Sequence, residues 1–230
     1  MPTAKRHFTP ELFAFLGDLR RNNDRTWFQA NKARYEEVAR DPALLFVSDF
    51  GPELRKVSRA FVADPRPVGG SLFRIYRDTR FARDKSPYKT HLGIHFRHQD
   101  AKDAHTPGFY LHLEPGACFS GIGIWRPDAD SLARLRTALV ENPKAWQKTI
   151  ATEPFRSAYE VSGDALKRPP KGFDPDHPLI EDLKRTDFVA VAKLTDKQVV
   201  SSGFLAEYSA LCKAGTPFMK WVCGALGVGW

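Results

Sequence analysis

Two groups of side chains in the middle of the chain could do chemistry. His112 and Glu114 are two residues apart, and an imidazole beside a carboxylate can exchange a proton with a bound molecule. Upstream, the run FRIYRDTRFARDKSPYK at 73–89 is rich in arginine and lysine. Guanidinium and ammonium groups at this density favour phosphates, carboxylates or a nucleic-acid backbone. We therefore expect a site for an anion, with an acid and base pair close to it.

The positive charge of the chain is concentrated in this region. Residues 71–98 hold seven Lys/Arg and two Asp, a net charge of +5, whereas the whole chain of 230 residues carries +8. A nucleic-acid track usually spreads its charge over a longer surface. The sequence therefore favours a small anionic ligand, and a nucleic-acid-binding module remains the alternative. An interaction domain for an acidic protein is a third possibility.

Helices are predicted on both sides of this region. Apolar residues recur at helical spacing from Pro10 to Arg20, and Asp24 is placed to cap a second helix. A third helix is expected from about Pro42 to Phe61, with an interruption at Gly51 and Pro52. In the C-terminal part, the predicted helices are 128–140, 143–152 and a pair within 203–226.

Between the helices the apolar pattern changes to a period of two, which is typical of strands. The predicted strands are 72–78, 90–98, 108–114 and 119–125, with one more at 187–194. We expect an α+β fold with one antiparallel sheet of four to five strands, packed on one face by the N- and C-terminal helices. The chain is interpreted as a single domain, 1–230, with a helical part (1–62), a strand part (70–126) and a mixed part (127–230).

Alternation along the strands separates the two faces of the predicted sheet. Leu, Ile and Phe side chains form an apolar face for the helices, and polar and aromatic residues gather on the other face. The residues expected there are Arg74, Tyr76, His91, His95, Tyr110, His112, Glu114 and Trp125. Such a face can be polar for solubility alone. Tyr, Trp, His and Arg beside glycines are more typical of a partly covered cleft.

The loop after the first predicted strand would close one end of this face. Its expected ligand-binding residues are Arg77, Asp78, Arg80, Asp84, Lys85, Tyr88 and Lys89. The two aspartates have two interpretations: they pair with neighbouring arginines and fix the loop, or one of them binds a divalent metal or acts as a base.

The histidines of the predicted polar face and Glu114 are possible metal ligands. His91 and His95 are four residues apart, about 13 Å along a strand, which is too far for both to reach one ion. His112, Glu114 and a single histidine would be the only compact set. Because positive surroundings disfavour a cation, the sequence predicts no metal site, and it indicates no particular cofactor.

Motifs of the common enzyme classes are missing from the sequence. It contains no GxGxxG, GxxxxGK[ST], HExxH or GxSxG pattern. Cys118, Cys212 and Cys223 form no CxxC pair and are predicted to be reduced core thiols. The start of the sequence lacks the apolar segment of a signal peptide, and no run reaches membrane-spanning length. We expect a soluble cytoplasmic protein with no membrane partner.

Several long segments resemble a known family. They are FTPELFAFLGDLRRNNDRTWFQANKARYE, SLFRIYRDTRFARDKSPYKTHLGIHF, GFYLHLEPG with GIGIWRPD, and KRPPKGFDPDHPLIEDLKRTDFVA. Together they are similar to the domain of unknown function 2461 family of uncharacterised bacterial and fungal proteins. The resemblance implies one compact domain in a soluble intracellular protein, with RDTRF and DKSPYK in its hallmark segment, and it implies no activity.

The working hypothesis is therefore a protein that binds or acts on a small phosphate- or carboxylate-bearing ligand. Its basic residues would hold the anion and its aromatic residues would stack on a ring or sugar. The residues expected to hold the anion are Arg74, Arg77, Arg80, Lys85 and Lys89, and those expected to stack are Tyr76, Tyr110 and Trp125. His112 and Glu114 would serve as acid and base.

Overall fold

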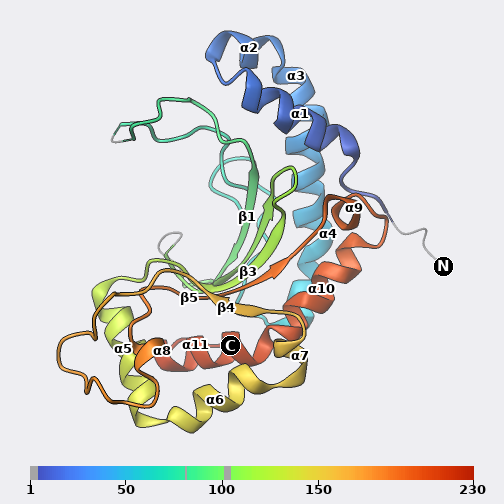
Figure 1. Cartoon of the computed structure of the whole chain (residues 1–230). Coiled ribbons are helices and arrows are strands. Elements are labelled where there is room, and N and C mark those ends of the chain that lie inside the picture. The colour runs from blue at the N-terminus through green and yellow to red at the C-terminus, as the bar shows by residue number, and fades with distance from the viewer. Residues whose placement is uncertain (1–4, 81, 101–104) are drawn as a thin grey trace.

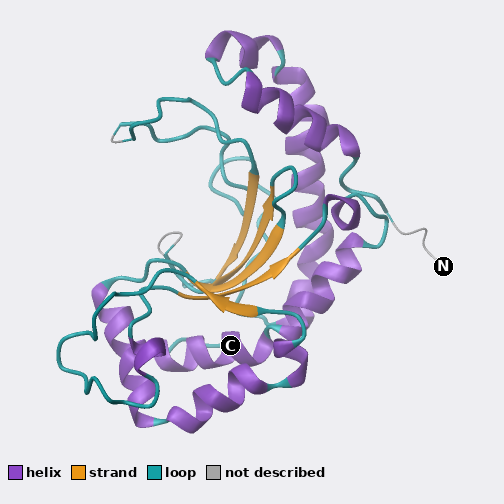
Figure 2. Cartoon of the chain, viewed as in Figure 1, coloured by secondary structure: helices purple, strands orange, loops and turns teal. Residues whose placement is uncertain are grey.

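One five-stranded antiparallel sheet forms the centre of the molecule in the computed structural model, which describes residues 5–80, 82–100 and 105–230 (Figure 1). The spatial order of its strands is β1-β2-β3-β5-β4. Their bounds are β1 (Leu92–Arg97), β2 (Gly108–Leu113), β3 (Phe119–Ile124), β4 (Glu160–Ser162) and β5 (Phe188–Lys193). The predicted α+β fold is confirmed, and Figure 2 shows the helices arranged around a curved sheet.

The N-terminal helices form an arm along one side of the sheet (Figure 1). They are α1 (Pro10–Arg21), α2 (Arg25–Ala30), α3 (Lys32–Tyr35), the π-helical turn η1 (Glu36–Arg40) and α4 (Asp41–Val57). Asp24 caps α2 as predicted, because its Oδ1 accepts from the Trp27 amide at 2.9 Å. The interruption expected at Gly51 and Pro52 is wrong, since α4 runs through both residues.

The C-terminal helices follow the sheet strands in the chain. They are α5 (Ala129–Glu141), α6 (Pro143–Ala151), α7 (Glu153–Arg156), α8 (Ile180–Leu183), α9 (Asp196–Val199), α10 (Phe204–Ala214) and α11 (Thr216–Leu226). Trp146 of α6 is fully buried against Phe218 and Trp221 of α11, with ring centroids 5.7 and 4.5 Å away. Within the described residues, no helix has the length and apolarity needed to cross a membrane.

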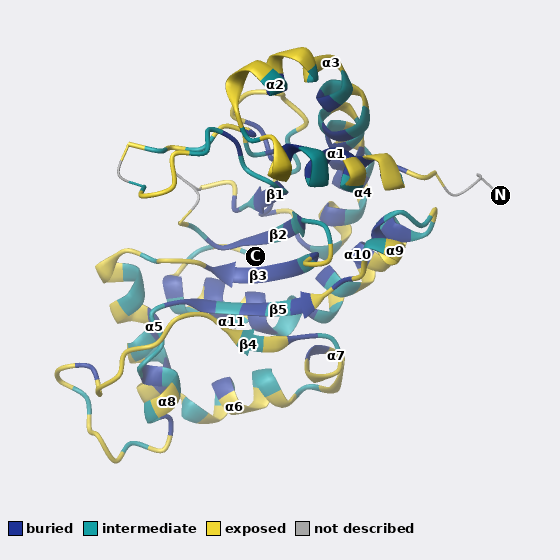
Figure 3. Ribbon diagram, turned by 45° about the horizontal axis from the view of Figure 1, so that its top comes forward, coloured by how far each residue is buried: buried dark blue, intermediate teal, exposed yellow. Residues whose placement is uncertain are grey.

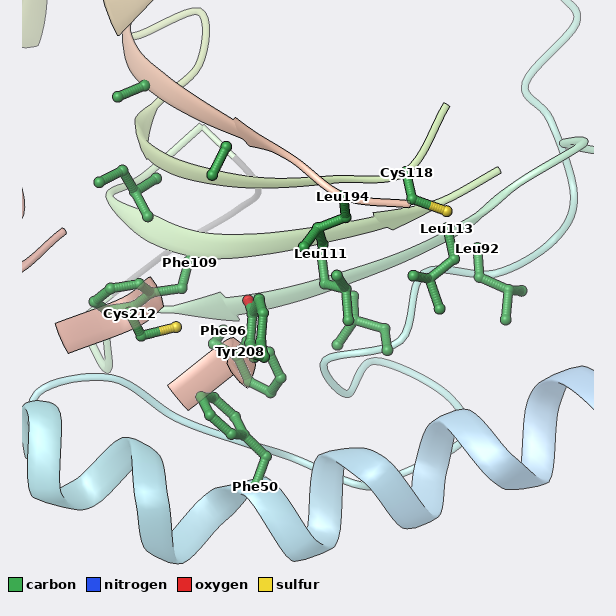
Figure 4. Packing of buried hydrophobic residues seen from close by; sticks show 14 of the residues in the cluster. Phe50, Leu92, Phe96, Phe109, Leu111, Leu113, Cys118, Leu194, Tyr208 and Cys212 are labelled. Carbon is green, nitrogen blue, oxygen red and sulfur yellow. The ribbon is translucent and has the colours of Figure 1, made fainter. Parts of the chain in front are cut away.

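The apolar face of the sheet packs on helices from both ends of the chain, as predicted. Phe96 of β1, Phe50 of α4 and Tyr208 of α10 form a buried trio in which the Phe50 ring lies 4.8 Å from Phe96 and 5.0 Å from Tyr208 (Figure 4). Figure 3 shows the resulting burial of the central strands. Burial of this aromatic area contributes several kcal/mol of folding free energy.

The cysteines belong to this interior. Cys118, Cys212 and Cys223 are free thiols and all are buried, so the prediction of core thiols is confirmed. Burial raises the pKa of the Cys118 and Cys223 thiols to about 12, which keeps both protonated and unreactive at neutral pH.

The predicted strand at 72–78 is wrong. In place of a strand, this segment forms two isolated bridges, Leu72 with Ile94 and Tyr76 with Tyr88. The chain leaves the sheet edge after residue 73, because the Arg77 amide donates to the Pro87 carbonyl and the Lys89 amide to the Ile75 carbonyl. Residues 74–80 and 82–89 therefore form the two limbs of a loop, the loop 74–89. These limbs pair with each other and extend away from the sheet in Figure 1.

This change moves Phe73 and Arg74 away from their predicted faces, whereas Ile75 is buried in the core. Phe73, which was predicted on the apolar face, packs over Gly93, where an added Cβ would lie 3.1 Å from Phe73 Cδ2. Arg74 is exposed instead of lining the polar face. Strand β4 was not predicted, because its three residues are too few to show alternation.

Candidate functional site

Two pockets lie beside the polar face of the sheet. The basic pocket has a volume of about 490 Å³ and is lined by Arg20, Asn23, Arg77, Asp84, Ser86, Tyr88, Lys89, Thr90 and His91. The apolar pocket has a volume of about 360 Å³. It is lined by Phe73, His95, Thr106, Gly108, Tyr110, His112, Phe119, Gly121, Ile122, Gly123, Trp125, Ser162, Gly163, Val189 and Val191.

The basic pocket is assembled where the loop 74–89 meets the N-terminal arm. Asn23, in the turn between α1 and α2, holds Tyr88 by two bonds. Its side-chain amide donates to the Tyr88 carbonyl at 3.0 Å, and its Oδ1 accepts from the Tyr88 amide at 3.1 Å. The Tyr88 ring stacks on Phe28 of α2 with centroids 4.0 Å apart. These contacts fix the returning limb of the loop against the helices.

Three cations and one carboxylate give the basic pocket its charge. Arg77 forms an ion pair with Asp84, and hydrogen bonds from Ser86 and Arg77 hold the pKa of that carboxyl well below its usual range. Lys89 Nζ donates to the Arg74 carbonyl at 2.9 Å and lies 5.5 Å from the Phe73 ring centre. Burial, and then the charge of Arg74, lower the Lys89 pKa. Arg20 is the third cation.

Three other charged residues of the run, Asp78, Arg80 and Lys85, are bonded within the loop. Arg80 forms an ion pair with Asp78 at 2.7 Å, and its hydrogen bonds lower the Asp78 pKa to about 2. Lys85 Nζ donates to the Thr79 carbonyl at 2.9 Å. Both aspartates therefore pair with arginines, which was the first of the two interpretations. Arg80, Asp78 and Lys85 lie outside the lining of both pockets, so the structure separates them from Arg77 and Lys89.

Two further predicted residues lie away from the pocket centres. Tyr76 is half-exposed, and its ring contacts Tyr88 and Phe28 instead of facing a pocket. Trp125 lines the apolar pocket but is half-exposed at its rim, with Arg126 placed 4.6 Å from its ring centre. Trp125 is therefore available to a ligand, and Tyr76 serves mainly to pack the loop.

A chain of hydrogen bonds runs along the polar side of β2. The Tyr110 hydroxyl lies 3.1 Å from His112 Nδ1, and His112 Nε2 lies 3.0 Å from Glu114 Oε2. With the imidazole proton on Nε2, His112 donates to Glu114 and accepts from Tyr110. The second oxygen of Glu114 accepts from Arg20 of α1. The predicted acid and base pair is thus in contact, and it lies at the junction of the two pockets.

His91 completes this group from the neighbouring strand. Leu92 pairs with Leu113, so His91 lies across from Glu114 at the next position of the register. The His91 and His112 rings are 4.3 Å apart, and one ligand atom each from His91, His112 and Glu114 lie within 4.8 Å of one another. Burial, followed by repulsion from His112, lowers the His91 pKa to about 4. Burial also lowers the His112 pKa, although Glu114 opposes this effect.

The apolar pocket is shaped by the backbone of the sheet. At Gly108 an added Cβ would lie 2.0 Å from His95 Nε2, and at Gly123 it would lie 2.0 Å from the Phe188 carbonyl oxygen. Gly123 also has a φ of +112°, a backbone conformation that residues other than glycine rarely adopt. Both glycines line the apolar pocket together with the rings of Phe73 and Tyr110. Burial lowers the pKa of His95, which was predicted on this face, to about 4.

Sequence reasoning missed several residues that line the pockets. Arg20 ends the first predicted helix, and Asn23 directly precedes Asp24, the predicted cap of the second helix. Neither shows a sequence signal for its contact with the sheet or the loop. The predicted strand 119–125 begins at Phe119, and its alternation puts Phe119 on the same side as Trp125, so the sequence contains the signal for this residue. Val189 and Val191 belong to β5, which lies beside β3 in the sheet. The pattern within the β5 segment does not show which strand it pairs with.

The chain was compared with known proteins. No curated protein matches it, and no solved structure matches it. A family model described as a conserved hypothetical protein (DUF2461) matches residues 11–221. This span includes both pockets and the group of His91, His112 and Glu114. The chain belongs to the DUF2461 family.

Proposed function

We propose that the protein binds a small anionic ligand, bearing a phosphate or carboxylate group, in the basic pocket. The observation that carries this proposal is the meeting of Arg20, Arg77 and Lys89 in one pocket, where Asp84 is the single carboxylate among the described lining residues. These cations come from a helix and from both limbs of a loop. A concave site with an excess of positive charge attracts anions and strengthens their binding by excluding water.

The donors of the pocket suit a compact oxyanion. Each guanidinium has five N–H donors, and one ion pair uses only part of this set. Arg77 and Arg20 can therefore bind a ligand while they stay paired with Asp84 and Glu114. Asn23, in the same lining, already uses its side chain to hold Tyr88. It therefore supports the proposed site without contacting the anion through that group.

The apolar pocket gives the ligand room for an uncharged part. The two pockets share a wall, because Lys89 lies over Phe73 and the His91 ring contacts His112. Rings of Phe73, Tyr110 and Trp125 line the apolar side and suit a flat or aliphatic body. In this arrangement His112 and Glu114 face the join between the anionic group and the body, which is where the predicted acid–base chemistry would act.

The experiment measures thermal stabilisation by a small panel of anions. Inorganic phosphate, citrate and adenosine monophosphate are added at millimolar concentration to the full chain and to Arg77→Gln and Lys89→Met variants. We expect at least one anion to raise the Tm of the natural protein and to lose this effect in both variants. Arg83→Gln is the matched control, since Arg83 is an exposed arginine of the same loop outside the pocket. An equal effect of all three substitutions would overturn the proposal.

The nucleic-acid alternative gives a different pattern. A phosphate backbone would use the exposed arginines of the loop as well as those in the pocket, so Arg83→Gln and Arg77→Gln would weaken binding alike. Fluorescence anisotropy with a labelled single-stranded oligonucleotide over a range of salt concentrations measures this. Micromolar affinity that falls steeply with salt would favour the alternative.

A further inference from the structure

Three metal-ligand side chains converge where the two pockets meet. His112 lies on β2, and Glu114 follows two residues later, just beyond the end of this strand at Leu113. Their side chains are in contact on the same face of the sheet, because His112 Nε2 lies 3.0 Å from Glu114 Oε2. His91 stands on the same face at the adjoining end of β1. One ligand atom from each lies within 4.8 Å of the other two. All three residues are partly buried, so an ion between them would still be reached from the pocket.

We propose that His91, His112 and Glu114 bind one divalent transition-metal ion, of which Zn²⁺ fits the donors best. Two imidazole nitrogens and one carboxylate oxygen are a donor set that zinc accepts when a fourth position is left open. The 3.0 Å between His112 Nε2 and Glu114 Oε2 is a separation that two ligands of the same small ion adopt. Calcium and magnesium prefer oxygen donors and suit this set poorly.

Two neighbouring contacts orient the proposed ligands. The Tyr110 hydroxyl holds His112 by Nδ1, which turns Nε2 toward Glu114. Arg20 takes one oxygen of Glu114 and leaves the other facing His112. Contacts of this kind to the far atom of a ligand are a regular feature of protein metal sites. On metal binding the His112 proton would move from Nε2 to Nδ1, where it can be donated to the Tyr110 oxygen.

The cations of the basic pocket would repel a metal ion that carries no bound anion. A divalent ion with one carboxylate leaves a net charge of +1, and the cations of the basic pocket lie close to it. An anion or hydroxide in the open position would offset this charge. His91 lines the basic pocket, so the open position would face the space where we propose that an anion binds. The surroundings therefore predict a modest metal affinity that rises when an anion is present.

A metal ion at this site is incompatible with the predicted acid–base role of His112. A metal on His112 Nε2 occupies the atom that an acid or base would use to exchange a proton with a ligand. The predicted acid–base role of His112 and the metal site are therefore alternatives for the same nitrogen. Metal binding would move any proton transfer to a water or hydroxide on the ion.

The test uses metal alone, in a buffer without phosphate or carboxylate. The full chain is stripped with a chelator and titrated with ZnCl₂ by calorimetry and with CoCl₂ by visible absorption. We expect one ion per chain and cobalt absorption bands in the visible range from a nitrogen and oxygen site. His91→Gln, His112→Gln and Glu114→Gln should each weaken binding at least tenfold. Circular dichroism shows whether each variant is folded.

His177→Gln is the matched control, because this histidine lies far along the chain and outside both pocket linings. It should bind the metal as the natural protein does. Absence of a one-to-one complex, or binding that survives in all three ligand variants, would overturn the proposal. The titration contains no phosphate or carboxylate, so this failure is distinct from a failure to bind the proposed ligand, and Arg83→Gln should leave the metal affinity unchanged.

Discussion

The two pockets beside the sheet are built in different ways. The basic pocket is made by side chains from separate segments, brought together by the contacts of Asn23 with Tyr88. The apolar pocket is made by the backbone of neighbouring strands, with Gly108 and Gly123 pressed against other atoms. Charge recognition therefore depends on a few replaceable contacts, whereas the shape of the apolar pocket depends on the hydrogen-bond ladder of the sheet. Substitutions should separate the two.

The largest effect is expected at the floor of the apolar pocket. Gly123→Ala places a Cβ 2.0 Å from the Phe188 carbonyl oxygen at a φ of +112°. We expect the free energy of unfolding to fall by about 3 kcal/mol, as measured by urea titration. Gly121→Ala is the control. The added Cβ would lie 3.6 Å from Phe119 Cε2, an ordinary contact distance, so the free energy of unfolding should fall by less than about 1 kcal/mol. Equal losses at the two positions would contradict a backbone-built floor.

A pH effect is expected from His95 in the same pocket. Burial, with a smaller effect of Arg97, lowers its pKa to about 4 in the folded protein, against about 6.5 when unfolded. Above pH 6.5 the ring is neutral in both states. Between pH 6.5 and 4 only the unfolded chain binds the proton. The free energy of unfolding therefore decreases by up to about 3 kcal/mol as the pH is lowered from 6.5 to 4.

His95→Gln tests this by removing the titrating ring. The variant should lose less stability than the natural protein between pH 7 and 4, in urea titrations at both pH values. Below pH 4 the two curves should run parallel. Parallel curves over the whole range would show that His95 titrates normally.

The basic pocket should be loosened by Asn23→Ala. This substitution removes both bonds to Tyr88, whose backbone groups are buried, and should reduce the free energy of unfolding by about 2 kcal/mol. The anion affinity should fall as well, because the loop limb that carries Lys89 loses its support. Asn22→Ala is the neighbouring control, since the side-chain amide of Asn22 donates to the Asp18 carbonyl of its own helix, 2.9 Å away. A smaller loss at Asn23 than at Asn22 would refute this assignment.

The smallest effect on stability is expected at Trp125, which is half-exposed. Trp125→Ala should cost less than about 1 kcal/mol. It should weaken binding of an uncharged aromatic probe such as naphthalene several-fold, and leave phosphate binding unchanged. Arg77→Gln should give the reverse result. Calorimetry with both probes on both variants measures this, and a loss of both probes in either variant would mean that the pockets act as one.

The sequence predicts the sheet better than it predicts the loop at its edge. Alternation places Tyr110, His112 and Glu114 on one face because a strand has a fixed period of two. The same rule fails at 72–78, where pairing of the loop with its own return limb replaces pairing with the sheet. Alternating residues look the same in both cases. Phe73 and Arg74 are therefore assigned to the wrong sides.

The candidate site was predicted in part for the same reason. His112 and Glu114 are two residues apart in the predicted strand 108–114, so their contact follows from spacing. The contacts of Arg20 with Glu114 and of Asn23 with Tyr88 join residues more than 60 positions apart. They depend on where the helical arm lies against the sheet. No pattern within either segment carries that information.

The self-paired loop has a consequence for motion. Its limbs are joined by the bonds from the Arg77 and Lys89 amides, so the loop can open without breaking the β1–β2 ladder. Amide hydrogen exchange at Arg77 and Lys89 should then report local opening, and exchange at Ile94 should report unfolding of the whole sheet. A ligand in the basic pocket would slow the first and barely change the second. The basic pocket would thus bind and release its ligand on the timescale of a loop, while the sheet beneath it stays folded.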